Sequence, residues 1–504
     1  MTSEKKKPLR VLMAASEGVP YSKTGGLADV IGALPQALAA DGVEVAVVLP
    51  LHRSTKLEKS KELIPSLTVA LGSRLHFPRV VEAPKKAKVR WIFVDYPPFF
   101  GRDSLYVGKD GKDFPDNPER FSLFARAVLE IAKSVFRPDI LHCHDWQAGL
   151  APVLLRTAYA QDKLLSEIPS VFTIHNLGYQ GLFPSDALLR AGLGWDLFTM
   201  DGLEFYGQVN FLKGALLHAS AVSTVSRKYA LEIQTPEYGF GLEGVLRQRA
   251  GRVSGILNGV DYSDWDPAAD KLIAANYTAA KLDGKQACKR DLLRAFQLPE
   301  SDAQLPLIGI VSRFTRQKGA DLIAEVAERL LSERIRLVAL GTGEPEYESL
   351  FRELAARFPD RVAVRIAYDN VLAHKIEAGA DMFLMPSYYE PCGLNQMYSL
   401  RYGTVPVVRA TGGLDDTIEE YDAAAGQGTG FKFSSYTGAA LLGSLSRALA
   451  VYQDSAQWTR LMRNGMAKDF SWDRSAREYR KLYEGLTQPA PATRPAGKQS
   501  SAEK

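Results

Sequence analysis

The stretch SKTGG at residues 22–26 combines a cation with flexible backbone, between a strand-like run and a helix-like run. The N-terminus of a helix offers N–H groups and partial positive charge, which suits a phosphate. Gly25 and Gly26 would let such a ligand approach the backbone closely, and Lys23 would add a full charge. Because neither the Walker loop nor G-x-G-x-x-G is present, a tight turn with a solvated lysine is the other interpretation.

Three cations follow another strand-like run, at residues 307–311. Arg313, Arg316 and Lys318 stand just beyond its end. This pattern is typical of a solvated loop. It also fits a clamp for a diphosphate, in which Arg313 and Lys318 neutralise the charge of a leaving group.

The sequence TGGL occurs twice, at residues 24–27 and 411–414. The second copy also follows a strand-like run, and it lies in the opposite half of the chain. Two helix N-termini, one from each half, would then face one cleft. This pairing favours a diphosphate ligand.

A carboxylate and a thiol follow the apolar run at 382–385. Glu390 is poorly placed for packing and could accept hydrogen bonds from a polyhydroxyl substrate. Cys392, near an expected helix start, could be a nucleophile of low pKa. Since no histidine lies nearby in the sequence, packing or positioning of the loop is the favoured interpretation for this thiol.

Histidines mark two further strand ends. His142, His144 and Asp145 place possible metal ligands close together, but no second ligand cluster is visible, so we expect no metal and no cofactor. His175, in the sequence TIHN, ends another strand. A lone histidine is usually structural, but this one shares its location with the other candidates.

The elements that must position these residues form a repeating pattern. Short apolar runs alternate with helical runs through the first half of the chain, and the pattern starts again after residues 255–267. Such a pattern predicts parallel sheets covered on both faces, with ligands beyond the carboxyl ends of the strands. We therefore expect two doubly wound, Rossmann-like α/β domains facing a cleft, at residues 1–258 and 259–470, with a hinge near 258–267. Residues 471–487 are predicted to form a helix that returns to the first domain, and 488–504 a disordered tail.

Composition excludes several classes of protein. The chain has 504 residues, a net charge of +4 and 46% hydrophobic residues, so we expect a globular protein that binds neither nucleic acid nor a membrane. Its three cysteines are widely spaced, which argues against a disulfide framework and fits a reducing cytoplasm. No apolar run reaches the length of a membrane span.

Five motifs in order give the chain its resemblance to a known family: SKTGGLADV, HCHDWQAGL, TIHNLGYQG, VSRFTRQKG and EPCGLNQMYSLRYGTVPVVRATGGL. From about Arg10 to about Tyr483 the chain resembles bacterial glycogen (starch) synthases, which are retaining glycosyltransferases of the GT-B fold. The resemblance implies transfer of glucose from ADP-glucose to the non-reducing end of an α-1,4-glucan such as glycogen.

The resemblance also implies roles for individual residues. Those expected to take part in catalysis are Glu390 at the transferred glucose, Arg313 and Lys318 at the diphosphate, His175 against the reacting face, and Asp145 at a sugar hydroxyl. Those expected to bind substrate are Lys23, Gly25, Gly26, Asp29, Asn176, Tyr368 near adenine, Cys392, Gly393, Leu394, Asn395, Thr411, Gly412 and Gly413.

One position departs from the family pattern. The family usually has an arginine where this chain has Tyr388, and we expect the tyrosine to contact glucan at the cleft mouth or to pack beside the Glu390 loop. Three other functions stay open: a non-catalytic glucan-binding protein, a phosphorylase and a UDP-sugar transferase. Nothing in the sequence supports the pyridoxal phosphate of a phosphorylase, and the set Lys23, Arg313, Lys318 and Glu390 argues against a dead enzyme.

Overall fold

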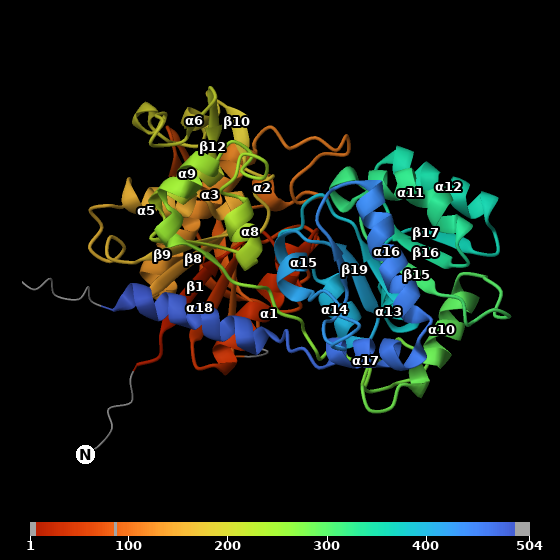
Figure 1. Cartoon of the computed structure of the whole chain (residues 1–504). Coiled ribbons are helices and arrows are strands. Elements are labelled where there is room, and N and C mark those ends of the chain that lie inside the picture. The colour runs from red at the N-terminus through yellow and green to blue at the C-terminus, as the bar shows by residue number, and fades with distance from the viewer. Residues whose placement is uncertain (1–6, 85–87, 489–504) are drawn as a thin grey trace, which may run out of the picture.

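The computed structural model describes residues 7–84 and 88–488. Two sheets, each covered by helices on both faces, lie on either side of a cleft (Figure 1). The tail expected to be disordered falls, apart from residue 488, outside the described residues.

Seven parallel strands make up most of the first sheet, from one edge inward. Apart from the half-buried strand at that edge, residues 253–255, their apolar runs are almost completely buried, because helices cover both faces. In spatial order they are β14 (Val253–Gly255), β13 (Ala221–Thr224), β9 (Ser170–Ile174), β8 (Ile140–His144), β1 (Arg10–Ala14), β2 (Glu44–Pro50) and β7 (Arg90–Asp95).

Two further strands extend this sheet beyond β7 through antiparallel pairing. The sheet is therefore mixed, whereas the sequence predicted a purely parallel one. The two strands are β6 (Arg79–Glu82) and β3 (Lys61–Ile64). Both are short and partly exposed, and Lys61 and Glu62 face water. An edge strand without a continuous apolar run gives little signal in the sequence.

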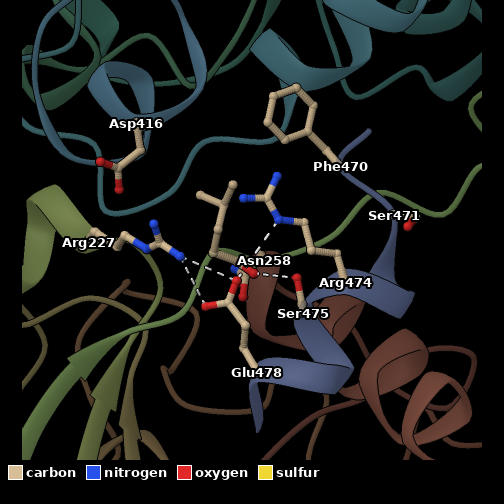
Figure 2. A pocket seen from close by; sticks show the side chains of 9 residues that line it. Arg227, Asn258, Asp416, Phe470, Ser471, Arg474, Ser475 and Glu478 are labelled. Carbon is tan, nitrogen blue, oxygen red and sulfur yellow. Dashed lines mark hydrogen bonds and ion pairs between the residues drawn. The ribbon is translucent and has the colours of Figure 1, made fainter. Parts of the chain in front are cut away.

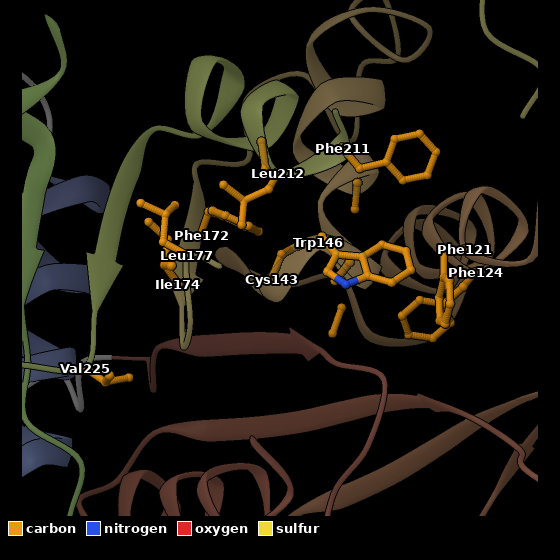
Figure 3. Close-up of a cluster of buried hydrophobic side chains, with 14 of the residues drawn as sticks. Phe121, Phe124, Cys143, Trp146, Phe172, Ile174, Leu177, Phe211, Leu212 and Val225 are labelled. Atoms are coloured by element: carbon orange, nitrogen blue, oxygen red, sulfur yellow. The ribbon is translucent and has the colours of Figure 1, made fainter. Parts of the chain in front are cut away.

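Two layers of helices cover the first sheet. On one face α1 (Gly26–Ala40) packs against α18 (Trp472–Thr487), with Trp472, Tyr479 and Tyr483 in the shared core. On the other face lie α3 (Asn117–Ile131), α5 (Leu150–Arg156) and α7 (Phe211–His218). Figure 3 shows the aromatic part of that core, where Trp146 packs edge-on against Phe121.

The second sheet contains six parallel strands. In spatial order they are β17 (Val362–Ile366), β16 (Arg336–Gly341), β15 (Leu307–Val311), β18 (Met382–Met385), β19 (Val405–Arg409) and β20 (Phe431–Phe433). One core includes α11 (Ala320–Ser332), α12 (Pro345–Arg357) and α16 (Gly438–Tyr452). Further helices of this domain are α10 (Asp283–Ala295), α13 (Asn370–Gly379), α14 (Asn395–Arg401) and α17 (Ser455–Met466).

The chain crosses between the two sheets twice, and the crossings lie side by side. Val260 N donates to Phe470 O at 2.7 Å, and Phe470 N donates to Tyr262 Oη at 2.9 Å. A small cavity of about 110 Å³ lies next to the crossings, where Glu478 of α18 approaches Arg227 and Arg474 (Figure 2). Two adjacent crossing strands are the expected geometry of a hinge.

Two smaller sheets decorate the first domain. One pairs β10 (Leu182–Pro184) with β12 (Gln208–Asn210) and β11 (Glu204–Phe205); the other pairs β4 (Val69–Leu71) with β5 (Arg74–His76). Short helices that matter below are α8 (Arg227–Glu232) and α15 (Gly412–Thr417). Across the described part of the chain, every helix is too short or too polar to cross a membrane. The three cysteines are buried and free.

Candidate active site

A cleft of about 1000 Å³ separates the two domains, beyond the carboxyl ends of both sets of parallel strands. It brings together the residues expected at the site, with the exception of Thr411, Gly412 and Gly413. From the first domain come Lys23, Gly25, Gly26, Asp29, Asp145, His175 and Asn176; from the second come Arg313, Lys318, Tyr368, Glu390, Cys392, Gly393, Leu394 and Asn395.

Glu390 forms the most buried ion pair of the cleft. Lys318 Nζ donates to Glu390 Oε2 at 2.5 Å, and Ser387 Oγ donates to the same oxygen at 3.1 Å. The Glu390 side chain is 6% exposed and that of Lys318 is 20% exposed. A buried carboxylate needs such partners, and Lys318 and Ser387 supply them at the cleft wall.

Arg313 and Asn395 flank this pair. Arg313 follows β15, and its guanidinium is exposed in the cleft, with one weak contact to Gln317 Oε1 at 3.4 Å. Asn395 begins α14 and donates from Nδ2 to the carbonyl oxygen of Val311 at 2.7 Å. The guanidinium of Arg313 therefore has most of its N–H groups available to an anion in the cleft.

The SKTGG turn forms the opposite wall. Its backbone is bound from beneath by Glu17, whose carboxylate accepts hydrogen bonds from Thr24 N and, at 2.9 Å, from Thr24 Oγ1. Lys23 Nζ contacts Asp29 Oδ1 at 2.7 Å. A Cβ built on Gly25 or Gly26 would meet no atom within 4 Å, so the first turn of α1 is open to the cleft.

Three histidines stack beneath the cleft floor. The rings of His142 and His144 are 4.0 Å apart, and His144 Nδ1 lies 3.0 Å from His175 Nε2. Burial lowers the pKa of His142 and of His175 to about 3, and lowers that of His144 well below its usual range. These rings are therefore neutral near pH 7, so His175 can exchange hydrogen bonds but carries no charge.

Asp145 joins this floor through an unusual backbone. It has a φ of 54°, and its Oδ1 accepts a hydrogen bond from His175 N at 2.8 Å. Burial, and then the charge of Glu17, raise the pKa of Asp145 to about 7. The carboxyl thus titrates near neutral pH. Within residues 7–84 and 88–488, no group of three or more His, Cys, Asp and Glu side chains is arranged to hold a metal ion.

Cys392 is not the low-pKa nucleophile that was one interpretation of its sequence context. Its side chain is buried, and burial raises the pKa of the thiol to about 12. A thiol that stays protonated near pH 7 is a poor nucleophile. Packing and positioning of the loop remain, as the sequence favoured.

The second TGGL turn is built differently from the phosphate cradle that we expected. Gly412 N donates to Glu232 Oε2 at 3.0 Å, and Thr411 Oγ1 lies 3.1 Å from Glu232 Oε1. Glu232 belongs to α8 of the opposite domain. A Cβ on Gly412 or Gly413 would overlap the carbonyl oxygen of Glu390 or of Cys392. This turn supports the Glu390 loop from behind: the Gly412 amide is bound to the Glu232 carboxylate, and Gly413 N donates to the carbonyl oxygen of Glu390 at 3.1 Å.

Comparison with known proteins agrees with these features. Residues 10–248 match the family described as the starch synthase catalytic domain, and residues 294–463 match glycosyl transferases group 1. A glycogen synthase of Koribacter versatilis is 58% identical over 480 residues, which cover 95% of this chain and 99% of that protein. A glycogen synthase of Anaeromyxobacter sp. (strain Fw109-5) is 49% identical, over 95% of this chain and 100% of the relative. The chain belongs to the glycogen synthase family.

Solved structures place this glycogen synthase family member in a known architecture. The catalytic domain of starch synthase IV from Arabidopsis thaliana, bound to ADP and acarbose, is 33% identical and superposes with a TM-score of 0.87, covering 95% of this chain and 100% of that chain. A sucrose-phosphate synthase from Thermosynechococcus elongatus, 19% identical, shares the fold with a TM-score of 0.58. The protein is thus a glycosyltransferase with two Rossmann-like domains of the GT-B type.

Tyr388 lies outside the cleft lining, in a cluster around Arg409. The Arg409 guanidinium is 5.8 Å from the centre of the Tyr388 ring and 5.4 Å from that of Tyr436. It also donates to Tyr388 O, and to the hydroxyl of Tyr238 from the opposite domain at 3.1 Å. Of the two interpretations of this departure from the glycogen synthase pattern, packing beside the Glu390 loop fits this position.

Sequence reasoning missed the two glutamates that bind the TGGL turns. Glu17 is buried and lies three residues beyond the end of β1, much as Asp145 follows β8, so its place after a strand was a usable signal. Glu232 gave no such signal, because it lies at the end of a helix and reaches the second turn only across the domain interface. Trp265 was also missed; it lines the cleft, stacked between Tyr398 at 3.9 Å and His374 at 3.7 Å.

Proposed function

We propose that this protein transfers glucose from ADP-glucose to the non-reducing end of an α-1,4-glucan such as glycogen, with retention of configuration. The observation that carries the proposal is one cleft in which the cations Arg313 and Lys318 and the charged Glu390 face the open turn at Gly25 and Gly26. Membership of the glycogen synthase family supports it.

The diphosphate of the donor would lie between the two walls. Arg313 offers several N–H groups, and Lys318 retains N–H bonds after binding Glu390, so both can bind phosphate oxygens. Gly25 and Gly26 would admit the diphosphate to the N-terminus of α1. Tyr368 is 82% exposed at the cleft, which leaves a ring face for adenine. ADP in the starch synthase IV structure is consistent with this arrangement.

The glucosyl group would lie against Glu390 and the cleft floor. Glu390 supplies a carboxylate acceptor for sugar hydroxyls from the second domain. Asp145 supplies another from the first domain, beside the neutral polar groups of His175 and Asn176. As the anomeric carbon gains positive charge, the fixed charge of Glu390 would stabilise it more than the ground state.

Retention in this site follows from the positions of the charged groups. Glu390 is engaged by Lys318 and Ser387, so we assign it an electrostatic role rather than that of a nucleophile. The bond between the anomeric carbon and the phosphate oxygen would break while the acceptor hydroxyl attacks from the same face. The hydroxyl proton would pass to the departing phosphate oxygen, and Arg313 and Lys318 would stabilise the ADP that leaves.

Closure of the domains would complete the site. Phosphate-binding groups from the second domain and sugar contacts from the first would come together by rotation about the paired crossings at 258–262 and 470–472. We further propose that the protein acts in the cytoplasm, which its three free cysteines support.

The test is a donor comparison. Purified protein is incubated with glycogen and labelled ADP-glucose or UDP-glucose, and incorporation is measured together with the anomeric configuration of the new linkage. We expect α-1,4 extension from ADP-glucose, with UDP-glucose much poorer. Equal or faster transfer from UDP-glucose would overturn the donor assignment, and glucan binding without transfer would make the chain a non-catalytic glucan-binding protein.

A further inference from the structure

Three aromatic side chains form an exposed surface that begins in the cleft and leads away from it over the first domain. Tyr179, Tyr206 and Phe240 are 55%, 83% and 41% exposed. They come from three separate segments of the chain, and we call this surface the aromatic ridge. Aromatic side chains of this size are normally at least partly buried. The gathering of three exposed rings in one place therefore needs an explanation.

The order of the ridge follows from close contacts. Tyr179 lines the cleft. A Cβ on its neighbour Gly178 would lie 3.5 Å from the Phe240 ring, and a Cβ on Gly241 would lie 3.5 Å from the Tyr206 ring. The ridge therefore runs from Tyr179 through Phe240 to Tyr206. Phe240 also packs edge-on against Tyr389, the neighbour of Glu390, at 5.5 Å between ring centres.

The backbone presents two of these rings in a costly conformation. Tyr206 and Phe240 both have a φ of 49°, and each is followed by a glycine of positive φ. Tyr206 and Gly207 form the two-residue turn between β11 and β12, where Asn-Gly is the favoured pair. A bulky side chain at positive φ is uncommon and strained, and such strain concentrates at functional positions.

Buried hydrogen bonds hold the ridge in place. Gln180 Nε2 donates to the carbonyl oxygen of Phe240 at 3.1 Å, and Asn210 Nδ2 donates to Gln180 Oε1 at 2.7 Å. Gln180 and Asn210 are themselves buried. This network connects the turn that carries Phe240 to the segment that lines the cleft, so the rings are fixed relative to the reaction centre.

We propose that the aromatic ridge binds the acceptor glucan over the sugar units that follow its reacting non-reducing end. The apolar faces of successive glucose rings would pack on Tyr179, then Phe240, then Tyr206. An α-glucan is favoured over other occupants because the ridge is continuous with the cleft that would hold the acceptor end. The inference rests on the proposed function, and it makes the ridge a determinant of chain-length preference.

The test compares acceptors of increasing length. Tyr206→Asn removes the ring and keeps a residue that tolerates positive φ, so the turn should persist. We expect the KM for maltoheptaose or glycogen to rise by roughly threefold to tenfold, as for the loss of one aromatic contact. Maltotriose and ADP-glucose should be affected less than twofold, whereas Tyr179→Ala should weaken short acceptors as well.

Controls separate the ring from the fold. Tyr206→Phe should retain long-acceptor kinetics. Phe77→Ala, which removes an aromatic side chain 52% exposed just after β5, should leave the kinetics with both substrates unchanged. Unchanged kinetics of Tyr206→Asn with all acceptors would overturn the inference while wild-type transfer from ADP-glucose stands. Calorimetric binding of maltoheptaose keeps the ridge testable if transfer itself fails. A change of oligomeric state in Tyr206→Asn without loss of glucan affinity would assign the ridge to a second copy of the chain, and would also overturn it.

Discussion

The two TGGL turns have the same sequence and opposite surroundings. At residues 24–27 a Cβ on either glycine would meet no atom within 4 Å, and both glycines line the cleft. At 411–414 a Cβ on either glycine would overlap backbone of the Glu390 loop. In the first turn glycine leaves the cleft wall open; in the second it allows two backbone segments to touch.

A glutamate binds each turn, and its origin differs. Glu17 belongs to the same domain as the first turn and lies seven residues before Thr24. Glu232 comes from the domain opposite the second turn, and beside it Lys228 N donates to Asp416 Oδ2 at 3.0 Å. Burial raises the pKa of both glutamates. A glycine-rich helix start is thus an open wall of the cleft in one place and a joint between domains in the other.

The largest expected effect comes from filling the packed turn. Gly413→Ala places a methyl group against the carbonyl oxygen of Cys392 and should displace the Glu390 loop. Because small displacements of a catalytic group are costly and an overlap with backbone is destabilising, we expect kcat to fall by roughly a hundredfold and the melting temperature to fall as well. Gly26→Ala is the matched change in the open turn and should leave the melting temperature unchanged. Equal losses of kcat in the two variants would remove the distinction between the turns.

The next effect concerns two lysines, Lys318 near the Glu390 loop and Lys23 in the open turn, whose loss should change different kinetic constants. Lys318→Ala removes the partner of Glu390, and we expect kcat to fall by roughly a hundredfold, as for loss of one preorganised charge. Lys23→Ala, beside the open turn, breaks an exposed pair with Asp29 and should mainly raise the KM for ADP-glucose. Steady-state kinetics with both substrates measures this. A normal kcat in Lys318→Ala would show that this cation is part of a solvated loop.

Loss of the contact between Glu232 and the second TGGL turn should lower the stability of the protein more than it lowers kcat. Glu232→Ala leaves Gly412 N and Thr411 without their acceptor, and a buried donor left unsatisfied costs about 1–3 kcal/mol. We expect a lower melting temperature and a larger radius of gyration by solution scattering, because the domains lose a contact. Lys228→Ala is the control, because it keeps the backbone bond to Asp416 and loses only the partly exposed ion pair of Lys228 Nζ with Asp415 Oδ2 at 3.6 Å. An unchanged melting temperature and radius of gyration in Glu232→Ala would contradict the assignment of a joint.

A smaller difference is expected in the pH dependence. With its pKa near 7, Asp145 is protonated below neutral pH, and we expect kcat to rise as the pH increases from about 6 to 8, because the ionised form stabilises positive charge. A raised carboxyl pKa also means that the free energy of unfolding decreases as the pH rises from 3.8 to about 7. Asp145→Asn should remove both trends.

The two glutamates supply the comparison for this profile. Glu17→Gln should move the midpoint to lower pH, because the charge of Glu17 helps to raise the pKa of Asp145. Glu232→Gln, at the joint, should leave the midpoint in place. The same midpoint in wild type and Glu17→Gln would show that the first glutamate is electrostatically separate from the floor.

The smallest effect is expected at Tyr388. Tyr388→Arg replaces the aromatic ring that packs against the Arg409 guanidinium with a second cation. This change should lower the free energy of unfolding by about 0.5–1 kcal/mol. Because Tyr388 is absent from the cleft lining, both Michaelis constants should stay within twofold. A selective rise in the KM for glycogen would instead support the interpretation that Tyr388 contacts the acceptor glucan.

The sequence by itself determined the elements and most of the candidate cleft. Continuous apolar runs mark the parallel strands, because burial on both faces requires them, and residues that follow such strands meet at one edge of a sheet. Arg313, Lys318, Glu390, Asp145 and His175 were found in this way. The edge strands β6 and β3 escaped, since short and partly exposed strands have no such pattern.

Only the tertiary structure decided what depends on contacts between distant segments. The two TGGL copies differ by what packs over them, and Glu232 approaches the second from 179 residues away. The aromatic ridge joins Tyr179, Phe240 and Tyr206, which share no periodicity in the sequence. Local sequence specifies helices, strands and turns through short-range sterics and burial, whereas the surroundings of a turn are set by which elements the fold brings against it.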